Sequence, residues 1–311
     1  MRTSTLIFLA LIFFLLVGGY LFTQRAKEPG VESIFTTLGQ KKWLKADRIK
    51  VFFDGEKGFS LVREPETWLI EDDFPKPASK VLIQEFLRQL ADLSGEKRAE
   101  GDKFFPRFKV GDKEALHIVL YQGKQELAHI LVGKRGPQWN SSFVRLKGQK
   151  EIYLVPVNLL SKFEIWSVEP GFPKAKDFLD LEVLEVPLAK LKTLSFRGQK
   201  VSWTLLRKED HNPQTFVLKI GTKEKRLSSE EAEKFLHRLF PLYAEKVIKP
   251  EEFKGKRATL TFVSRLGREV EVDFGACQKE KDQEICLVKR PPFVYQVNQS
   301  LIEAFFKPSF P

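Results

Sequence analysis

The side chains best suited to chemistry in this chain are one acidic run, four histidines and two cysteines. Glu71, Asp72 and Asp73 form the sharpest acidic cluster. Neighbouring carboxylates can hold a cation or divide acid and base roles, so Asp72 and Asp73 support the hypothesis of a carboxylate-based hydrolase assembled only in the fold. Consecutive acids just ahead of Pro75 and Pro77 are also typical of a solvated turn, which is the interpretation we favour.

The histidines are not spaced with other ligand residues in a pattern that would identify a metal site. His117, His129, His211 and His237 are scattered, and no H-E-x-x-H pattern includes them. No nucleophile motif such as G-x-S-x-G occurs either. We therefore predict no catalytic, cofactor-binding or metal-binding residue, no cofactor, and a protein that is not an enzyme.

Cys277 and Cys286 are the only cysteines, and they flank a polar loop between two predicted strands. Paired strands would bring the two sulfur atoms together, which permits a disulfide in an oxidising compartment. Two half-buried thiols fit the same pattern equally well. The C-x8-C spacing has no further cysteine or histidine nearby, which argues against zinc.

The tryptophans divide into core and surface candidates. Trp68 and Trp203 occupy predicted strand positions, where a large ring is usually buried. Trp139 lies in the predicted loop "GPQWNSS", where burial is harder. An exposed loop tryptophan indicates a contact surface, so Trp139 is our candidate residue for one.

The N-terminal segment differs in composition from the rest of the chain. Residues 3–24 carry no charge, and "LIFLALIFFLLV" lies at their centre. Such a run reaches roughly 30 Å as a helix, about the thickness of a bilayer's hydrocarbon. We predict an uncleaved transmembrane signal anchor over residues 1–24. The alternative is a signal peptide cleaved before Tyr20, which would release a soluble exported protein.

Charge and the leader together suggest a location and a class of partner. Arg2 is the single charged residue among residues 1–24, so the remainder of the 311-residue chain keeps a net charge of about +10. A single leader before a large domain usually exports that domain. We expect a single-pass protein of the inner, cytoplasmic membrane with most of its chain outside the cytoplasm. Its cationic surface favours a protein partner or an anionic envelope polymer rather than nucleic acid.

Similar landmarks recur in the same order in the two halves of the chain. "FDGEK" and "FRGQK" predict glycine hairpins, and "TWL" and "TFV" predict strands. A helical stripe of leucines and phenylalanines, a second glycine hairpin and a closing strand follow in both halves. The aligned positions are Phe86, Leu87, Leu90 and Leu93 with Phe235, Leu236, Leu239 and Leu242 in the helices, and Gly123 with Gly267 in the second hairpin.

These patterns predict an α+β fold of two duplicated modules, each an antiparallel sheet packed on one amphipathic helix, after an N-terminal transmembrane helix. The expected boundaries are a membrane anchor at 1–24, a juxtamembrane tether at 25–45, a first module at 46–166, a linker at 167–189 and a second module at 190–311. The linker assignment rests on the Pro- and Gly-rich stretch that opens with "SVEPGFP".

Several stretches also resemble a known family. "WLIEDDFPKPASKVLIQEFLRQLADL", "LAHILVGK", "FVRLKGQKEIYLV" and "FLDLEVLEVPLAKLKTLSF" are similar to the uncharacterised bacterial family called domain of unknown function 4340, over about residues 60–290. The resemblance implies a membrane-tethered extracytoplasmic protein, similar to the exported region of auxiliary components of gliding-motility-type ABC transport systems. It transfers no catalytic residue.

The expected function is that of a membrane-anchored extracytoplasmic binding or scaffold protein of the bacterial cell envelope, as an auxiliary component of an ABC-type transport or envelope assembly system. The alternative is an envelope hydrolase with a carboxylate-based site.

Overall fold

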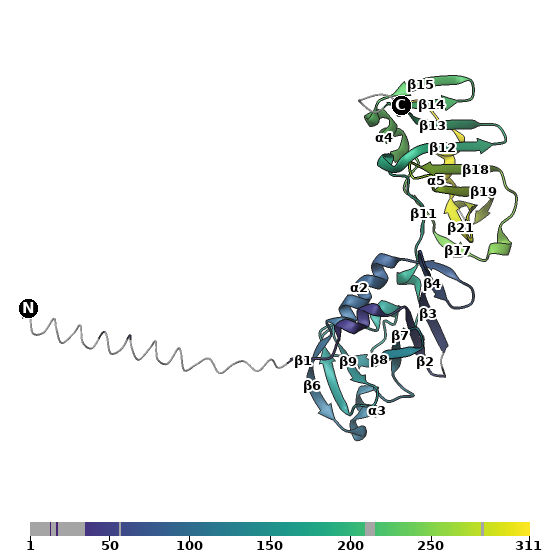
Figure 1. Cartoon of the computed structure of the whole chain (residues 1–311). Helices are drawn as coiled ribbons and strands as arrows, with labels where there is room; N and C mark the ends of the chain where they lie inside the picture. Colours follow the sequence, from purple (N-terminus) through teal and green to yellow (C-terminus); the bar gives the residue numbers. More distant parts are fainter. Residues whose placement is uncertain (1–12, 14–16, 18–34, 56, 209–214, 281–282) are drawn as a thin grey trace, which may run out of the picture. The chain divides into compact units, whose positions relative to one another are not determined.

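The computed structural model describes residues 13, 17, 35–55, 57–208, 215–280 and 283–311 (Figure 1). The chain divides into two compact units, Met1–Gly58 with Gln84–Lys174 and Phe59–Ile83 with Ala175–Pro311. Within the described residues the strands form three mostly antiparallel sheets.

The first sheet has ten strands. In spatial order they are β1 (Phe35–Thr37), β6 (Ser94–Glu100), β10 (Glu151–Val155), β9 (Ser142–Leu146), β8 (Gln125–Arg135), β7 (Leu116–Gln122), β2 (Arg48–Phe53), β3 (Lys57–Arg63), β4 (Trp68–Glu71) and β5 (Lys76–Ala78).

The second sheet pairs two short strands, β11 (Glu182–Leu184) and β16 (Leu242–Tyr243). The third sheet has nine strands. In spatial order they are β15 (Lys223–Leu227), β14 (Thr215–Ile220), β13 (Ser202–Lys208), β12 (Leu191–Gly198), β18 (Ala258–Ser264), β19 (Glu269–Glu280), β20 (Gln283–Arg290), β21 (Phe293–Asn298) and β17 (Lys246–Ile248).

Helices in the described residues are short. The α-helices are α2 (Lys80–Ala91), α3 (Phe105–Phe108), α4 (Ser229–His237) and α5 (Gln299–Phe306). The 3-10 turns are η1 (Lys41–Lys45), η2 (Asp102–Phe104), η3 (Ser161–Phe163), η4 (Lys176–Phe178), η5 (Leu188–Lys190) and η6 (Pro250–Glu252).

The predicted α+β fold class is wrong. The described chain is mostly antiparallel sheet in three sheets, rather than two sheets that each pack on one helix. The sequence did not predict the two-stranded sheet of β11 and β16, because each strand has three residues or fewer and is too short to show alternation. The predicted anchor at 1–24 lies outside the described residues apart from Phe13 and Val17. Among the residues that are described, no helix has both the length and the apolar character to cross a membrane.

Nine strands follow one order in both large sheets. From β6 to β5 the first sheet passes through β10, β9, β8, β7, β2, β3 and β4. From β17 to β15 the third sheet passes through β21, β20, β19, β18, β12, β13 and β14. In each case a helix follows the last strand in the list, α2 after β5 and α4 after β15.

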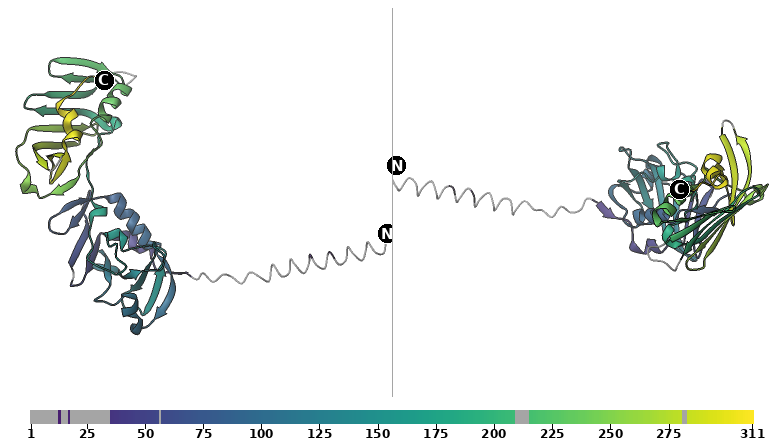
Figure 2. Two further views of the ribbon diagram at one scale, coloured as in Figure 1. Left: turned by 180° about the vertical axis from the view of Figure 1, so that it is seen from behind. Right: turned by 90° about the horizontal axis from the view of Figure 1, so that it is seen from above.

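The core of the third sheet lies on one face. Its strands alternate, so that Leu194 and Phe196 of β12 are buried while their neighbours are partly exposed. Trp203 of β13 contacts both Phe235 of α4 and Phe305 of α5, which places both helices on that face. Helix α5, yellow in Figure 2, follows β21 and packs back onto β20 and β21.

Short sequence patterns determine the local conformation at the start of α4 and at two glycine hairpins. Ser228 and Glu231 form a capping box at the start of α4. Gly123 and Gly267 adopt the positive φ that their hairpins require. Gly198 does not, because it ends strand β12 within the ladder to β18.

Candidate functional site

Trp139 is exposed, at 61 % of its accessible surface, on a loop that its neighbours hold firmly. Asn158 Nδ2 donates a hydrogen bond of 3.0 Å to the Trp139 carbonyl. Gly136 N donates to the Ser141 carbonyl at 3.0 Å, and a Cβ at Gly136 would lie 2.2 Å from Ser141 Oγ. These contacts fix the conformation of the loop between β8 and β9, which leaves the Trp139 indole exposed to solvent.

A cation lies on the indole face. The Arg135 guanidinium carbon is 4.1 Å from the Trp139 ring centroid, a cation–π contact. Arg135 N also donates to the Val168 carbonyl at 2.7 Å, which brings the half-exposed Val168 to the same strand end. We call Arg135, Trp139 and Val168 the Trp139 surface. Tryptophan and arginine are the residues most enriched at energetically dominant interface positions.

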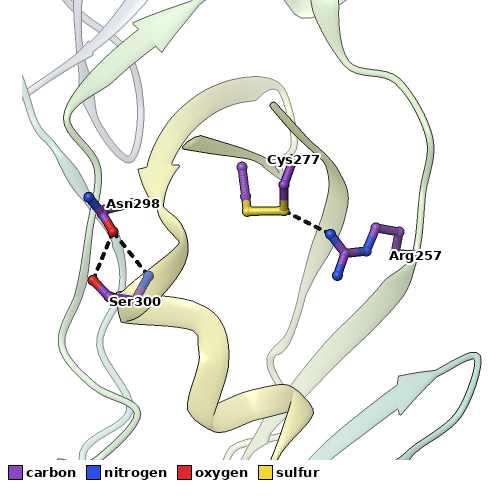
Figure 3. Close-up of a disulfide and its surroundings, with 5 residues drawn as sticks. Arg257, Cys277, Asn298 and Ser300 are labelled. Carbon is purple, nitrogen blue, oxygen red and sulfur yellow. Dashed lines mark hydrogen bonds between the residues drawn. A yellow bond between two sulfur atoms is a disulfide. The ribbon is translucent and has the colours of Figure 1, made fainter. Parts of the chain in front are cut away.

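Cys277 and Cys286 form a disulfide in the structure. They are direct partners in the ladder between β19 and β20, with Cα atoms 3.9 Å apart. Arg257 Nη1 lies 2.7 Å from Cys277 Sγ (Figure 3). Nearby, Asn298 Oδ1 accepts hydrogen bonds from the backbone and hydroxyl of Ser300 at the start of α5 (Figure 3). The bond thus ties the polar end of the hairpin, while Cys286 is buried in the core.

The acidic run forms an ion-pair cluster. Lys76 Nζ lies 2.6 Å from Asp72 Oδ2 and 2.7 Å from Asp73 Oδ1. Two side-chain hydrogen bonds lower the pKa of Asp73 to about 2. The bond from Lys76 has the larger effect and the bond with Asp72 the smaller. A general acid needs a pKa near the operating pH, so Asp73 is unsuited to donate a proton at neutral pH.

His117 and His129 form a pair that we did not predict. His117 Nδ1 lies 2.8 Å from His129 Nε2, both rings are buried, and Phe52 stacks on His117 at 4.5 Å. His117 Nε2 also lies 2.8 Å from the Asp112 carbonyl oxygen. Their spacing does not predict the contact, because the β7–β8 ladder pairs His117 with Leu131 and His129 with Val119, so the two rings meet diagonally. His237 is exposed beside Glu233, and His211 lies outside the described residues.

Burial disfavours protonation of this pair. It lowers the pKa of His129 to about 4, helped by His117 and Lys147, while Asp112 opposes the shift. Burial likewise lowers the pKa of His117. Within the described residues no three His, Cys, Asp or Glu side chains are grouped as a metal site would require. Burial thus favours the neutral form of both rings, which form a hydrogen-bonded pair in the core.

Acid should destabilise the protein through this pair. Since the folded pKa of His129 is about 4 and the unfolded value about 6.5, the unfolded chain binds more protons between these pH values. The stabilisation is complete above about pH 6.5 and is lost as the pH falls toward 4. We expect urea denaturation to give a free energy of unfolding about 2 kcal/mol lower at pH 5 than at pH 7.

His129→Gln serves as the control, because glutamine keeps a polar side chain that does not titrate. Its free energy of unfolding should depend less steeply on pH over the same interval. Equal slopes for the two proteins would contradict the role assigned to His129 in the acid response.

The described fold is that of a mostly antiparallel β protein with exposed aromatic and cationic side chains on ordered loops. The chain belongs to the family described as Domain of unknown function (DUF4340), whose model matches residues 46–259. Neither a curated protein nor a solved structure matches it.

Proposed function

We propose that this chain is a membrane-anchored, extracytoplasmic binding and scaffold protein of the bacterial cell envelope. It engages a partner protein through the Trp139 surface and serves as an auxiliary component of an ABC-type transport or envelope assembly system. The resemblance to auxiliary components of gliding-motility-type ABC systems supports the assembly, and the chain's basic character supports an acidic face on the partner.

The Trp139 surface is the observation that carries the proposal. An indole that is 61 % exposed and held by hydrogen bonds costs little entropy to bind, because its loop is already ordered. Arg135 lies over the same ring and adds a positive charge. Tryptophan and arginine are both enriched among the residues that dominate the binding energy of protein interfaces.

Location outside the cytoplasm is supported by the uncharged segment 3–24 and by the disulfide, since disulfides persist in oxidising compartments. We expect protease added to spheroplasts with an intact inner membrane to digest the part of the chain that is proposed to lie outside the cytoplasm. A cytoplasmic marker protein should stay uncut in the same sample. Digestion that requires lysis of the inner membrane would contradict this location.

A photo-crosslinking amino acid in place of Trp139 should capture one partner protein in living cells. The same substitution at Tyr243, an exposed aromatic of β16, should not capture it. In the purified pair, Trp139→Ala should weaken binding at least about tenfold, because a buried interface tryptophan contributes about 2 kcal/mol or more.

The matched control for affinity is Tyr243→Ala, which also removes an exposed aromatic ring. It should bind the partner as the unaltered protein does. Identical crosslinked products from positions 139 and 243, or unchanged affinity of Trp139→Ala, would count against the Trp139 surface as the binding site.

A further inference from the structure

A groove of about 820 Å³ opens in the second unit, lined by residues between Glu182 and Arg290. One wall is β11 and the segment after it, including Leu184 and Pro187. The other wall is the β18–β19 hairpin from Phe262 to Val270. Its volume lies within the range of about 300–1,000 Å³ typical of small-molecule sites.

Two backbone hydrogen bonds and one from an arginine side chain hold the walls in place. Arg265 N donates to the Lys190 carbonyl at 2.9 Å, which joins the hairpin to η5. Arg290 Nη1 donates to the Val183 carbonyl at 2.8 Å, which joins β20 to β11. The tight turn closes with Gly267 N donating to the Ser264 carbonyl at 3.0 Å, at a φ of 79°. These hydrogen bonds fix the two walls of the groove.

Apolar side chains make up much of its lining. Phe262, which is buried, lines the groove together with Leu184 and Val270. Leu266 is 97 % exposed at the hairpin tip, where it has no core to cover. This exposed leucine in the lining offers apolar surface to a hydrocarbon chain.

Only some of the cationic side chains that line the groove form ion pairs. Arg268 pairs with Glu66 at 2.8 Å, a surface pair of small energy. Arg265 and Lys190 are exposed and have no hydrogen bond or ion pair through their side chains to any other described residue. Their backbones are hydrogen-bonded to each other, so these two cationic residues are neighbours in the lining of the groove. Two acids, Glu182 and Glu185, line the β11 wall.

We propose that this groove binds a single-chain amphiphile with an anionic head group, the head group beside Lys190 and Arg265 and the acyl chain over Phe262 and Val270. Fatty acids and lysophospholipids share this chemistry. A peptide strand fits less well, because the Lys190 carbonyl and the Arg265 N–H, which belong to two lining residues, are already hydrogen-bonded to each other. This inference is independent of the partner proposed for the Trp139 surface.

The test uses the full chain in nanodiscs of phosphatidylcholine, with cis-parinaric acid as the fluorescent probe. We expect saturable binding above that of empty nanodiscs, with displacement by palmitate and by lysophosphatidylglycerol. Stronger displacement by one of the two would identify a carboxylate or a phosphate as the preferred head group. Monopalmitoylglycerol, which lacks the charge, should displace the probe at least tenfold less well.

The charge-reversed double variant Lys190→Glu with Arg265→Glu should bind the probe at least tenfold more weakly. Lys200→Glu with Arg226→Glu is its matched control, because both residues are exposed in the same unit and the change in net charge is equal. The control should bind normally. Equal loss in both variants, or no saturable binding, would overturn the proposal.

A diazirine analogue of palmitate gives a second measurement that does not depend on a variant. After irradiation, the labelled peptides should come from the β18–β19 hairpin and the segment following β11. Labelling confined to other parts of the chain would also overturn the proposal.

Discussion

Replacing Trp203 with alanine is expected to lower the free energy of unfolding by about 3–5 kcal/mol. The side chain is 2 % exposed and touches Phe196, Phe235 and Phe305 with ring centroids 5.2–6.5 Å apart. Its Nε1 also donates a hydrogen bond of 2.9 Å to the Phe305 carbonyl. Alanine would leave a cavity between sheet, α4 and α5, and an acceptor without its donor.

Urea denaturation followed by circular dichroism measures this loss. Trp203→Phe should fall between the two proteins, because it keeps a ring but removes the donor to Phe305, at a cost of about 1–3 kcal/mol. Trp139→Ala is the control and should change stability by about 0.5 kcal/mol or less, since that ring is exposed. Equal urea midpoints for Trp203→Ala and the unaltered chain would refute the packing role assigned to Trp203.

Removing the disulfide by replacing Cys277 and Cys286 with alanine is expected to cost about 2.5–3 kcal/mol. The bond closes a short loop, with a sequence separation of 9, and loop closure limits the entropy of the unfolded chain by about that amount. Loss of the buried Cys286 sulfur from the core adds to the cost. Urea denaturation under oxidising conditions measures the difference.

A reducing agent gives the internal control. It should lower the stability of the unaltered protein toward that of the double variant, and leave the double variant unchanged. If reductant destabilises both proteins equally, or neither, the stabilisation does not come from the Cys277–Cys286 bond.

Much of the local structure follows from the sequence alone. Phe86, Leu87 and Leu90 are buried on one face of α2 as their spacing predicts, because side chains three and four positions apart share a helix face. Trp68 and Trp203 are in the core, and Trp139 is exposed. These outcomes depend on contacts within a few residues or on simple alternation, and composition and spacing report both.

Tertiary structure decided what depends on distant partners. Leu93 and Leu242 continue the predicted helical stripes, yet α2 ends at Ala91 and α4 at His237. Leu242 instead pairs with Leu184 in a sheet whose strands lie far apart in sequence. The α+β expectation was wrong for the same reason, since the number of strands depends on pairings that no local pattern specifies.

The candidate sites divide in the same way. Spacing placed Trp139 on a loop and the two cysteines on neighbouring strands, because hairpin register is a short-range property. It did not reveal the stacking of Arg135 on Trp139, the His117–His129 contact or the groove beside Lys190 and Arg265. Each of these arises where side chains from separate elements meet, and only the packed chain fixes those distances.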